Sequence, residues 1–451
     1  MIAIGVLAIL VISAAGLWTG IHNIAPRTSL SDLVSLGRPV DMNDPLAARI
    51  RHDERINILL MARGGAGSDN PNFTDTMLIL SIRPRSGESA LVSLPRFLLV
   101  DIPATSGRDV PGRLYSAFAL GAKPDNPNLR SSWKTATGPG DLAAATVAEV
   151  THLPIDYWIA IDIRGFRTII DAMDGIDVTV PATLDDPSYP VDETERRIHI
   201  HFNAGRQRMD GERALQYARS RLSSSEADRS ARQELVMVGI LQKLRALKPG
   251  TRLISLLGAL QDRLLTNLRP NEMRQLFDAQ RQLPLSEIHR VTVDSTNFVD
   301  ERPIPGGGEV EMPRDGNFAA LQHYLAFALP DRQLVAAQVP VTIFDGNDDY
   351  HLPANQTPAQ VEVDLLRRLG WNVSLGPSRA SLRLARTRLR VGDLTPVVNT
   401  GQWMAAYFAD PAVSDSSLAR AVEITLGSDF TRRIFPTGAG SAAIRGSGPL
   451  S

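Results

Sequence analysis

The sequence of 451 residues contains no cysteine, and its 48 basic side chains are balanced by 49 acidic ones. The first absence excludes disulfides, thiolate nucleophiles and cysteine-ligated zinc sites. Without a net positive charge the chain is not expected to bind nucleic acid, because such binding depends on a broad basic face that neutralises phosphates. The five tryptophans are scattered and form no pattern for stacking bases. Any cationic site must therefore arise from a local concentration of arginines.

Charge is also missing from the start of the chain, where Ile2 to Ile21 carries no charged side chain. As a helix this segment would span roughly 30 Å, the thickness of a hydrocarbon core. It has neither a basic region before it nor a clear cleavage site of the kind found in signal peptides. We therefore predict a transmembrane anchor at residues 1–22 and a polar tether at residues 23–54. The sequence does not specify its orientation, because Arg27 is the only basic residue nearby.

The remaining sequence, in a chain that is 43% hydrophobic, has the composition of globular domains. Residues 55–329 alternate between Val/Ile/Leu-rich runs and helical patterns, which predicts an α/β layer architecture. Apolar periodicity lapses at residues 330–338, which predicts a linker. Residues 339–435 then show a strand–helix–strand order and predict a smaller βαβ-type domain, and the Gly/Ser-rich residues 436–451 predict a disordered tail.

Within the larger domain, short apolar runs bounded by Gly, Pro and Asp predict strands, and spaced apolar residues predict helices. The strands are expected at Ile56–Met61, Met77–Ile82, Ala90–Leu94, Leu98–Ile102, Tyr157–Ile161 and Asp177–Val180, and the helices at Arg113–Ala122, Asp141–Thr151, Ile163–Met173 and Asn317–Leu329.

Arginines are concentrated in the stretch LQYARSRLSSSEADRSARQELV. Arg229, Arg232 and Gln233 share one helix face, where like charges destabilise an isolated helix by a few tenths of a kcal/mol. Arg219 and Arg221 end the preceding helix, where cations complement the helix dipole, so a purely structural role is an alternative for them. Two arginine-bearing helix ends joined by a short serine linker nevertheless favour an anion site. Guanidinium groups pair with phosphate oxygens, and a pyrophosphate can occupy several of them at once.

Four further residues could contribute to such a site. Asp69 and Asp75, in the Gly-rich stretch GGAGSDNPNFTDT, are oxygen ligands suited to Mg²⁺, although turn formation is a common alternative for Asp. The glycines could let backbone N–H groups approach an anion, which by itself is a weak signal. Arg96 follows a proline at a break between strands, and Arg113 is expected to start a helix, where a bound anion would relieve the unfavourable dipole.

His199 and His201 have the spacing of one strand face. A zinc site needs three or four ligands, and no third ligand is near them in the sequence. We therefore expect these histidines to lie on a strand surface.

The succession INILL, TDTMLILSI, SLPR, VDIP, GRLYSAFALG, DGERALQYARSR and EADRSARQ, between Ile56 and Leu247, resembles the LytR-CpsA-Psr family of membrane-anchored wall-glycopolymer ligases. The resemblance implies a three-layer α/β/α-like domain with a central mixed sheet. Residues Val339 to Thr431 resemble, more faintly, the LytR C-terminal domain. The implied activity is extracytoplasmic and assisted by Mg²⁺: a glycan carried on polyprenyl (undecaprenyl) diphosphate is transferred, through its phosphosugar end, to a hydroxyl of peptidoglycan.

The resemblance also implies roles for individual residues. The catalytic residues would be Asp75, Arg96, Arg219 and Arg221; the substrate-binding residues Arg113, Glu226, Arg229, Arg232 and Gln233; and the metal ligands Asp75 and Asp69. Apolar residues of the helices Asp141–Thr151 and Ile163–Met173 would form the wall of a tunnel for the polyprenyl tail.

Three positions depart from the family pattern: Phe97 stands where an acid is usual, Arg113 replaces a lysine, and Glu226 replaces an aspartate. Phe97 keeps two alternatives open, a non-catalytic module that binds polyprenyl phosphate or wall polymer, and a hydrolase of the lipid pyrophosphate. Asp75, Glu226 and Asp228 are candidates for the base that activates the acceptor hydroxyl.

Overall fold

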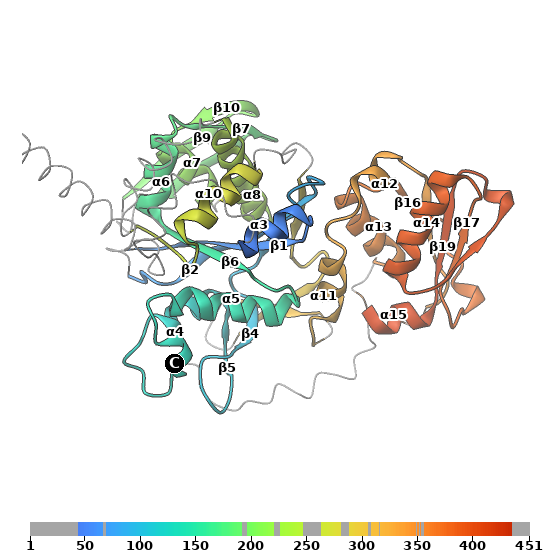
Figure 1. The fold of residues 1–451 in the computed structure, drawn as a ribbon, viewed down its shortest axis with the longest axis horizontal. Coiled ribbons are helices and arrows are strands. Elements are labelled where there is room, and N and C mark those ends of the chain that lie inside the picture. The colour runs from blue at the N-terminus through green and yellow to red at the C-terminus, as the bar shows by residue number, and fades with distance from the viewer. Residues whose placement is uncertain are drawn as a thin grey trace, which may run out of the picture. The chain divides into compact units, whose positions relative to one another are not determined.

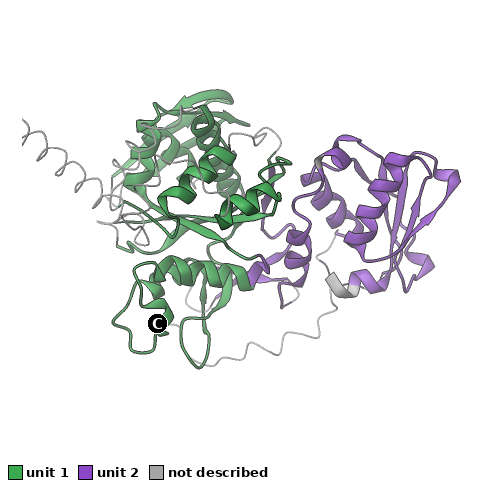
Figure 2. Ribbon diagram, viewed as in Figure 1, with its two compact units in different colours: residues 1–149, 154–288 green, residues 150–153, 289–451 purple. Residues whose placement is uncertain are grey.

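The computed structural model describes residues 44–65, 69–191, 196–220, 226–246, 263–280, 288–304, 308–314, 316–348, 350, 352 and 356–434. These residues form two compact units (Figure 2). The first ends at Ile288 and leaves out residues 150–153, which belong with residues 289 onward to the second. The predicted anchor and tail lie outside the described residues. Among the helices that are described, none combines the length and the apolar character needed to cross a membrane.

The first unit is built on a mixed sheet whose strands follow the order β11-β6-β1-β2-β3. Strand β1 runs parallel to β6, whereas the β1/β2, β2/β3 and β6/β11 pairs are antiparallel. The strands are β1 (Ile56–Arg63), β2 (Thr74–Ile82), β3 (Ser89–Leu94), β6 (Tyr157–Asp162) and β11 (Leu264–Thr266). The predicted central mixed sheet is thus confirmed.

Helices cover both faces of this sheet, which gives three layers (Figure 1). Helix α5 (Gly138–Thr151) covers one face, and α6 (Ile163–Ala172), α8 (Glu226–Ala246) and α10 (Pro270–Gln280) cover the other. Successive side chains of a strand point to opposite faces, and in β6 Trp158 points toward α5. A Cβ atom on Gly140 would lie 2.2 Å from the Trp158 ring, and the indole Nε1 donates a hydrogen bond to Asp141 at 2.8 Å.

The end of the predicted tether is instead part of the first unit. Asp44 caps helix α3 (Pro45–Arg51) by accepting hydrogen bonds from the backbone N–H groups of Leu46 and Ala47. Leu46 is buried in a core cluster that includes Leu276 of α10. The prediction of a polar tether through residue 54 was wrong for these residues, because the apolar face of this short helix packs against the domain.

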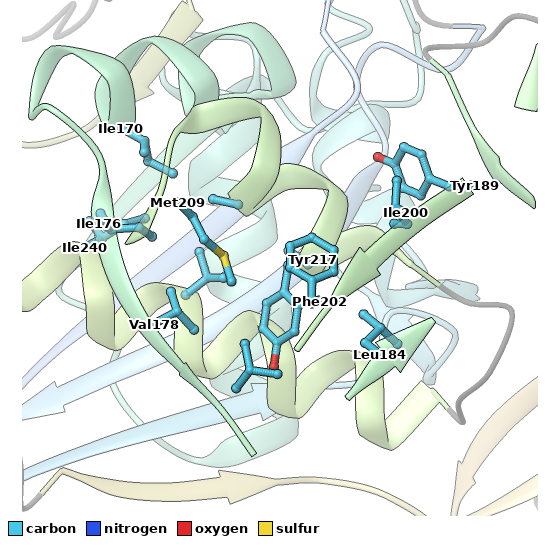
Figure 3. Close-up of a cluster of buried hydrophobic side chains, with 14 of the residues drawn as sticks. Ile170, Ile176, Val178, Leu184, Tyr189, Ile200, Phe202, Met209, Tyr217 and Ile240 are labelled. Carbon is cyan, nitrogen blue, oxygen red and sulfur yellow. The ribbon is translucent and has the colours of Figure 1, made fainter. Parts of the chain in front are cut away.

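Two two-stranded antiparallel sheets and α7 (Gly211–Arg219) lie on the side of α6 and α8. One sheet pairs β7 (Ile176–Val180) with β10 (Gly205–Met209), and the other pairs β8 (Leu184–Pro190) with β9 (Arg197–Phe202). Their inward side chains form a buried cluster with residues of α6, α7 and α8, among them Phe202, Tyr217 and Ile240 (Figure 3). This cluster fixes α7 and α8 against each other.

Between β3 and α5, the predicted helix Arg113–Ala122 begins later than expected. Arg113 ends strand β5 (Val110–Arg113), paired with β4 (Leu99–Ile102), and a 3₁₀ turn precedes the short helix α4 (Ala117–Gly121). Arg113 is the N-cap residue of this 3₁₀ turn, so it does lie at the start of a helical segment, although α4 itself begins four residues later.

The second unit contains a five-stranded sheet in the order β16-β15-β19-β17-β18. Strands β15 (Val341–Asp345) and β16 (Val373–Leu375) are parallel and joined through α13 (Pro358–Arg368), which is the predicted βαβ arrangement. The predicted linker contains a short helix, α12 (Arg332–Ala336). The other elements are β12 (His289–Thr292), β13 (Val299–Pro303), β14 (Glu309–Pro313), α11 (Ala319–Ala326), β17 (Arg388–Val391), α14 (Thr395–Phe408), β18 (Ala412–Ser414), β19 (Val422–Leu426) and α15 (Ser428–Ile434).

Candidate active site

A cavity of about 790 Å³ lies inside the first unit, between the sheet and the helices α6, α8 and α10. Its walls are mainly aliphatic, from inward positions of β2 such as Leu78 and Leu80 and from a stripe on α8 that includes Val236 and Ile240. The volume is in the range of small-molecule ligand pockets. Such a lining suits a hydrophobic chain.

Of the two helices predicted to form the wall of a tunnel, one lines this cavity and the other does not. Residues Ile163, Phe166 and Ile169 of α6 line the cavity, but no residue of α5 does. Helix α5 covers the opposite face of the sheet, where it packs on Trp158. The contributions of α8 and α10 could not be predicted from the sequence, since a stripe of apolar residues on a helix is equally typical of an ordinary core.

The cavity is charged where the strands of the sheet end. Because β2 is antiparallel to β1 and β3, the end of β1, the start of β2 and the end of β3 lie at one edge of the sheet. Helix α7 brings its last residue to the cavity, and α8 brings its first turns. The charged and amide side chains that line the cavity are Arg63, Asp75, Arg96, Asp186, Arg197, Arg219, Arg229 and Gln233.

A β-bulge accounts for the position of Asp75. Ala62 pairs with Thr76, but the next residue, Arg63, pairs with Thr74, so Asp75 is an extra residue on β2. Strict alternation would direct Asp75 away from the face that Leu78 and Leu80 share. A bulge breaks this alternation and re-aims side chains, often next to active sites. Both Asp75 and Arg63 consequently reach the cavity.

Asp75 forms an ion pair with Arg96, whose side chain is only 12% exposed. The guanidinium of Arg96 lies over the Phe97 ring, 4.3 Å from its centroid, and that of Arg113 lies 5.4 Å from the same centroid. The electron-rich face of an aromatic ring attracts cations. Phe97 thus contacts two arginine side chains at the position where an acid was expected.

Arg113 itself does not line the cavity. Its Nη1 donates a 3.4 Å hydrogen bond to the Tyr115 hydroxyl. Asp69 is exposed and also absent from the cavity lining, and Asp228 is exposed on α8. Arg221 and the side chain of Glu226 lie outside the described part of the chain, so their predicted roles stay predictions.

Arg232 holds the two arginine-bearing helices together instead of facing the cavity. It is buried, its Nε donates to the carbonyl oxygen of Tyr217 at 3.0 Å, and its Nη2 donates to that of Ser220 at 2.5 Å. These carbonyls end α7, where a cation is favourable. A role for Arg232 in direct substrate binding does not fit this geometry, whereas Arg229 and Gln233 on the same helix do line the cavity.

A buried aspartate, which the sequence analysis missed, supports the same junction. Asp186 on β8 accepts a 2.7 Å hydrogen bond from the Ser220 hydroxyl through Oδ2 and one from the backbone N–H of Ser188 through Oδ1. Ser220 directly follows Arg219. Together, Asp186 and Arg232 hold the end of α7, next to Arg219. The sequence gives no signal for Asp186, because its partner is 34 residues away.

The Gly-rich loop uses backbone donors internally. The N–H of Gly64 donates to the carbonyl of Phe73, and that of Gly65 donates to the carbonyl of Pro71. Gly65 has φ +81°, and a Cβ atom there would lie 2.5 Å from the Cβ of Asp162. At this position glycine is needed for the turn and for the close approach to Asp162, and these two N–H groups do not serve an anion as the sequence had suggested.

The family pattern implies Mg²⁺, and Asp75 fits one part of that requirement. Mg²⁺ is commonly held by one or two carboxylates together with substrate phosphates and water. Asp75 offers a carboxylate at the charged end of the cavity. In the described ranges, no group of three or more His, Asp or Glu side chains is arranged to hold a metal ion. Two carboxylates line the cavity: Asp186 accepts hydrogen bonds from Ser220 and Ser188, whereas Asp75 pairs with Arg96.

His199 and His201 lie exposed on β9, as expected for a strand surface. Both rings contact Oδ1 of Asp185, at 2.7 and 2.8 Å. The hydrogen bond with Asp185 raises the pKa of His201. Neither histidine lines the cavity.

The sequence profile of the LytR_cpsA_psr family matches residues 29–304. Among curated proteins, the chain is 25% identical over 323 residues to the polyisoprenyl-teichoic acid–peptidoglycan teichoic acid transferase TagU of Bacillus cereus strain AH820, which covers 70% of this chain and 88% of that protein. It is 27% identical over 241 residues to the Enterococcus faecalis TagU, and this alignment covers 52% of this chain and 69% of that protein. Among solved structures, B. subtilis TagV aligns with a TM-score of 0.47 and 20% identity over 60% of this chain and 96% of TagV. Since the family profile matches more than half of the sequence, this chain belongs to the LytR_cpsA_psr family.

Proposed function

We propose that this protein is a phosphotransferase that moves a glycopolymer from a polyprenyl-diphosphate carrier to a hydroxyl of peptidoglycan or another wall acceptor. The observation that carries the proposal is the aliphatic cavity that ends in a group of arginines. A polyprenyl diphosphate has the same two parts, a long apolar chain and an anionic head. The curated relatives are named as transferases that use a polyisoprenyl-linked teichoic acid and peptidoglycan, which supports the same reaction class.

The charged end of the cavity has what phosphoryl transfer requires from a protein. In this reaction catalysis is mostly positioning, together with stabilisation of charge on phosphate oxygens. Arg96, Arg219 and Arg229 would bind the diphosphate, and burial of Arg229 at 5% exposure strengthens its interaction with an anion. Arg221 is assigned the same role by the family pattern. Gln233 would orient a phosphate oxygen by donating from its side-chain amide.

Asp75 is the proposed ligand for Mg²⁺, with the substrate diphosphate supplying further oxygens. When bound, the ion would neutralise part of the charge that develops on the leaving phosphate. Arg96 pairs with Asp75 and thereby holds the carboxylate at the bulge. Asp69, the second predicted ligand, would have to reach this position from an exposed site on the loop.

The cellular location is also part of the proposal. The uncharged segment from Ile2 to Ile21 has the length of a single-pass membrane anchor. Carrier lipids of this class are held in the membrane, so an anchored enzyme with its soluble part outside the cytoplasm would meet the lipid headgroup at the membrane surface. Detergent extraction of the full-length protein from membranes, compared with a chain starting at residue 44, tests the anchor.

The reaction is tested with a glycan-loaded polyprenyl diphosphate, a purified peptidoglycan acceptor and Mg²⁺. We expect polyprenyl phosphate to be released only when the acceptor is present, and glycan to appear on peptidoglycan. Release of polyprenyl phosphate without an acceptor would favour the hydrolase alternative. Binding of the lipid with no release under any condition would favour the non-catalytic module, and chelation of Mg²⁺ distinguishes a metal-assisted reaction from one that needs arginines alone.

A further inference from the structure

Arg63 is a buried arginine at the charged end of the cavity that the sequence analysis did not identify. It is the last residue of β1, it is 9% exposed, and it lines the cavity together with Asp75, Arg96 and Arg229. The sequence did not indicate Arg63 as a site residue, because it comes at the end of an apolar run and belongs to no arginine-rich motif.

The sheet fixes the neighbours of Arg63. In the parallel pairing of β1 with β6, Arg63 is aligned with Asp162, and in the antiparallel pairing with β2 it is aligned with Thr74, next to the bulged Asp75. Asp162 is itself held in place, because its Oδ1 accepts a 2.7 Å hydrogen bond from the backbone N–H of Gly165 and caps α6. Arg63 therefore has a defined position relative to the metal-ligand candidate.

Arg63 places a guanidinium group in a cavity lining that is mostly aliphatic. Burial lowers the pKa of Arg63, and the negative charge of Asp162 opposes this effect without cancelling it. A multiply charged phosphate ligand in the cavity would further favour the charged guanidinium, since guanidinium groups pair well with phosphate oxygens in buried sites.

We propose that Arg63, positioned by Asp162, is an additional headgroup-binding residue that contacts the diphosphate of the lipid carrier at the edge of the sheet. This inference rests on the proposed function, because it assumes that the cavity binds a polyprenyl diphosphate. It adds a residue from β1 to a site otherwise formed by the loop after β3 and by the helices α7 and α8. Arg63 would hold the phosphate from the side of the sheet, opposite the arginines of the two helices.

The inference is tested by the binding of geranylgeranyl diphosphate and of geranylgeraniol, which has the same chain without phosphates. We expect Arg63→Met to weaken diphosphate binding by about 10- to 100-fold, the scale of one charged hydrogen bond, and to leave geranylgeraniol binding unchanged. Arg63→Lys should retain part of the affinity, because it keeps the charge. Equal losses for both ligands would overturn the inference and show that Arg63 only supports the fold.

Arg55, which immediately precedes β1, provides the matched control. It is also largely buried, burial lowers its pKa to about 10, and its Nε donates to Ser81 at 2.6 Å, but it does not line the cavity. Arg55→Met should destabilise the domain without changing the preference for diphosphate over alcohol. If wild-type protein shows no such preference, the proposed function itself fails. If the wild type shows it and Arg63→Met keeps it in full, only the role of Arg63 is refuted.

Discussion

A buried carboxyl group in the second unit makes the stability of that unit depend on pH. Glu362 of α13 is 1% exposed and accepts a 2.7 Å hydrogen bond from the Tyr407 hydroxyl of α14. Burial raises the pKa of Glu362 from 4.5 to about 7, although the hydrogen bond from Tyr407 opposes the shift. Between these two pH values the folded chain holds a proton that the unfolded chain has lost.

The sign and size of the effect follow from this difference. A raised pKa in the folded state stabilises the fold fully below pH 4.5, and the stabilisation is lost as the pH rises to about 7. Each unit of pKa shift corresponds to about 1.4 kcal/mol, so the free energy of unfolding of the second unit should fall by roughly 3 kcal/mol across this range. Glu362→Gln cannot ionise and still accepts the hydrogen bond from Tyr407. The variant should therefore lose most of this pH dependence.

The measurement is urea unfolding of the full chain at pH 5, 6 and 7, read by hydrogen exchange of peptides from residues 358–408 at one fixed labelling pH. Asp364→Asn is the control, because this carboxylate lies on the same helix with its side chain 52% exposed. It should leave the wild-type pH dependence unchanged. The reasoning is refuted if Glu362→Gln unfolds with the same dependence on pH as the wild type.

Three further predictions concern the first unit. Ile240→Trp inserts a large ring from α8 into the cavity, and it should weaken geranylgeranyl diphosphate binding at least tenfold with an unchanged circular dichroism spectrum; unaltered binding would show that the chain binds elsewhere. Arg229→Met should lower the transfer rate by about 10²–10³-fold, the effect of losing one electrostatic donor, and a loss below threefold in a steady-state assay would contradict its role. Gly140→Ala would place a methyl group 2.2 Å from the Trp158 ring and should cost about 1–3 kcal/mol of unfolding free energy. Gly107→Ala, where a Cβ meets nothing within 4 Å, should change the thermal unfolding temperature little.

The sequence predicted the central sheet well because its strands are continuous apolar runs. Strands β1, β2, β3 and β6 begin or end within three residues of the predicted bounds. The two-residue alternation that identifies a strand also indicates which side chains share a face, but it fails at the bulge, where Asp75 and Arg63 reach the cavity. A bulge depends on the pairing of two strands and leaves no clear pattern in either one alone.

The arginine-rich stretch illustrates a second limit. Its spacing correctly placed Arg229, Arg232 and Gln233 on one helix, and the structure brings Arg219, Arg229 and Gln233 to the cavity. The sequence could not distinguish the role of Arg232 from that of the others. Side chains three or four positions apart on a helix differ in direction by only about 40–60°, so they share a face without having to contact the same partner. The carbonyl groups that Arg232 contacts belong to another helix. Distinguishing a structural arginine from a ligand-binding one required that tertiary contact.

Helix α8 carries both kinds of cavity residue, with Arg229 near its start and Leu244 near its end. At 1.5 Å per residue these positions are about 22 Å apart along one straight element. If the cavity binds a polyprenyl diphosphate as proposed, α8 would set the distance between the sites for the headgroup and for the chain. A substitution that shifts or rotates α8 would move Arg229 and the aliphatic lining residues together. Such a variant should therefore change both the chain-length preference and the phosphate affinity.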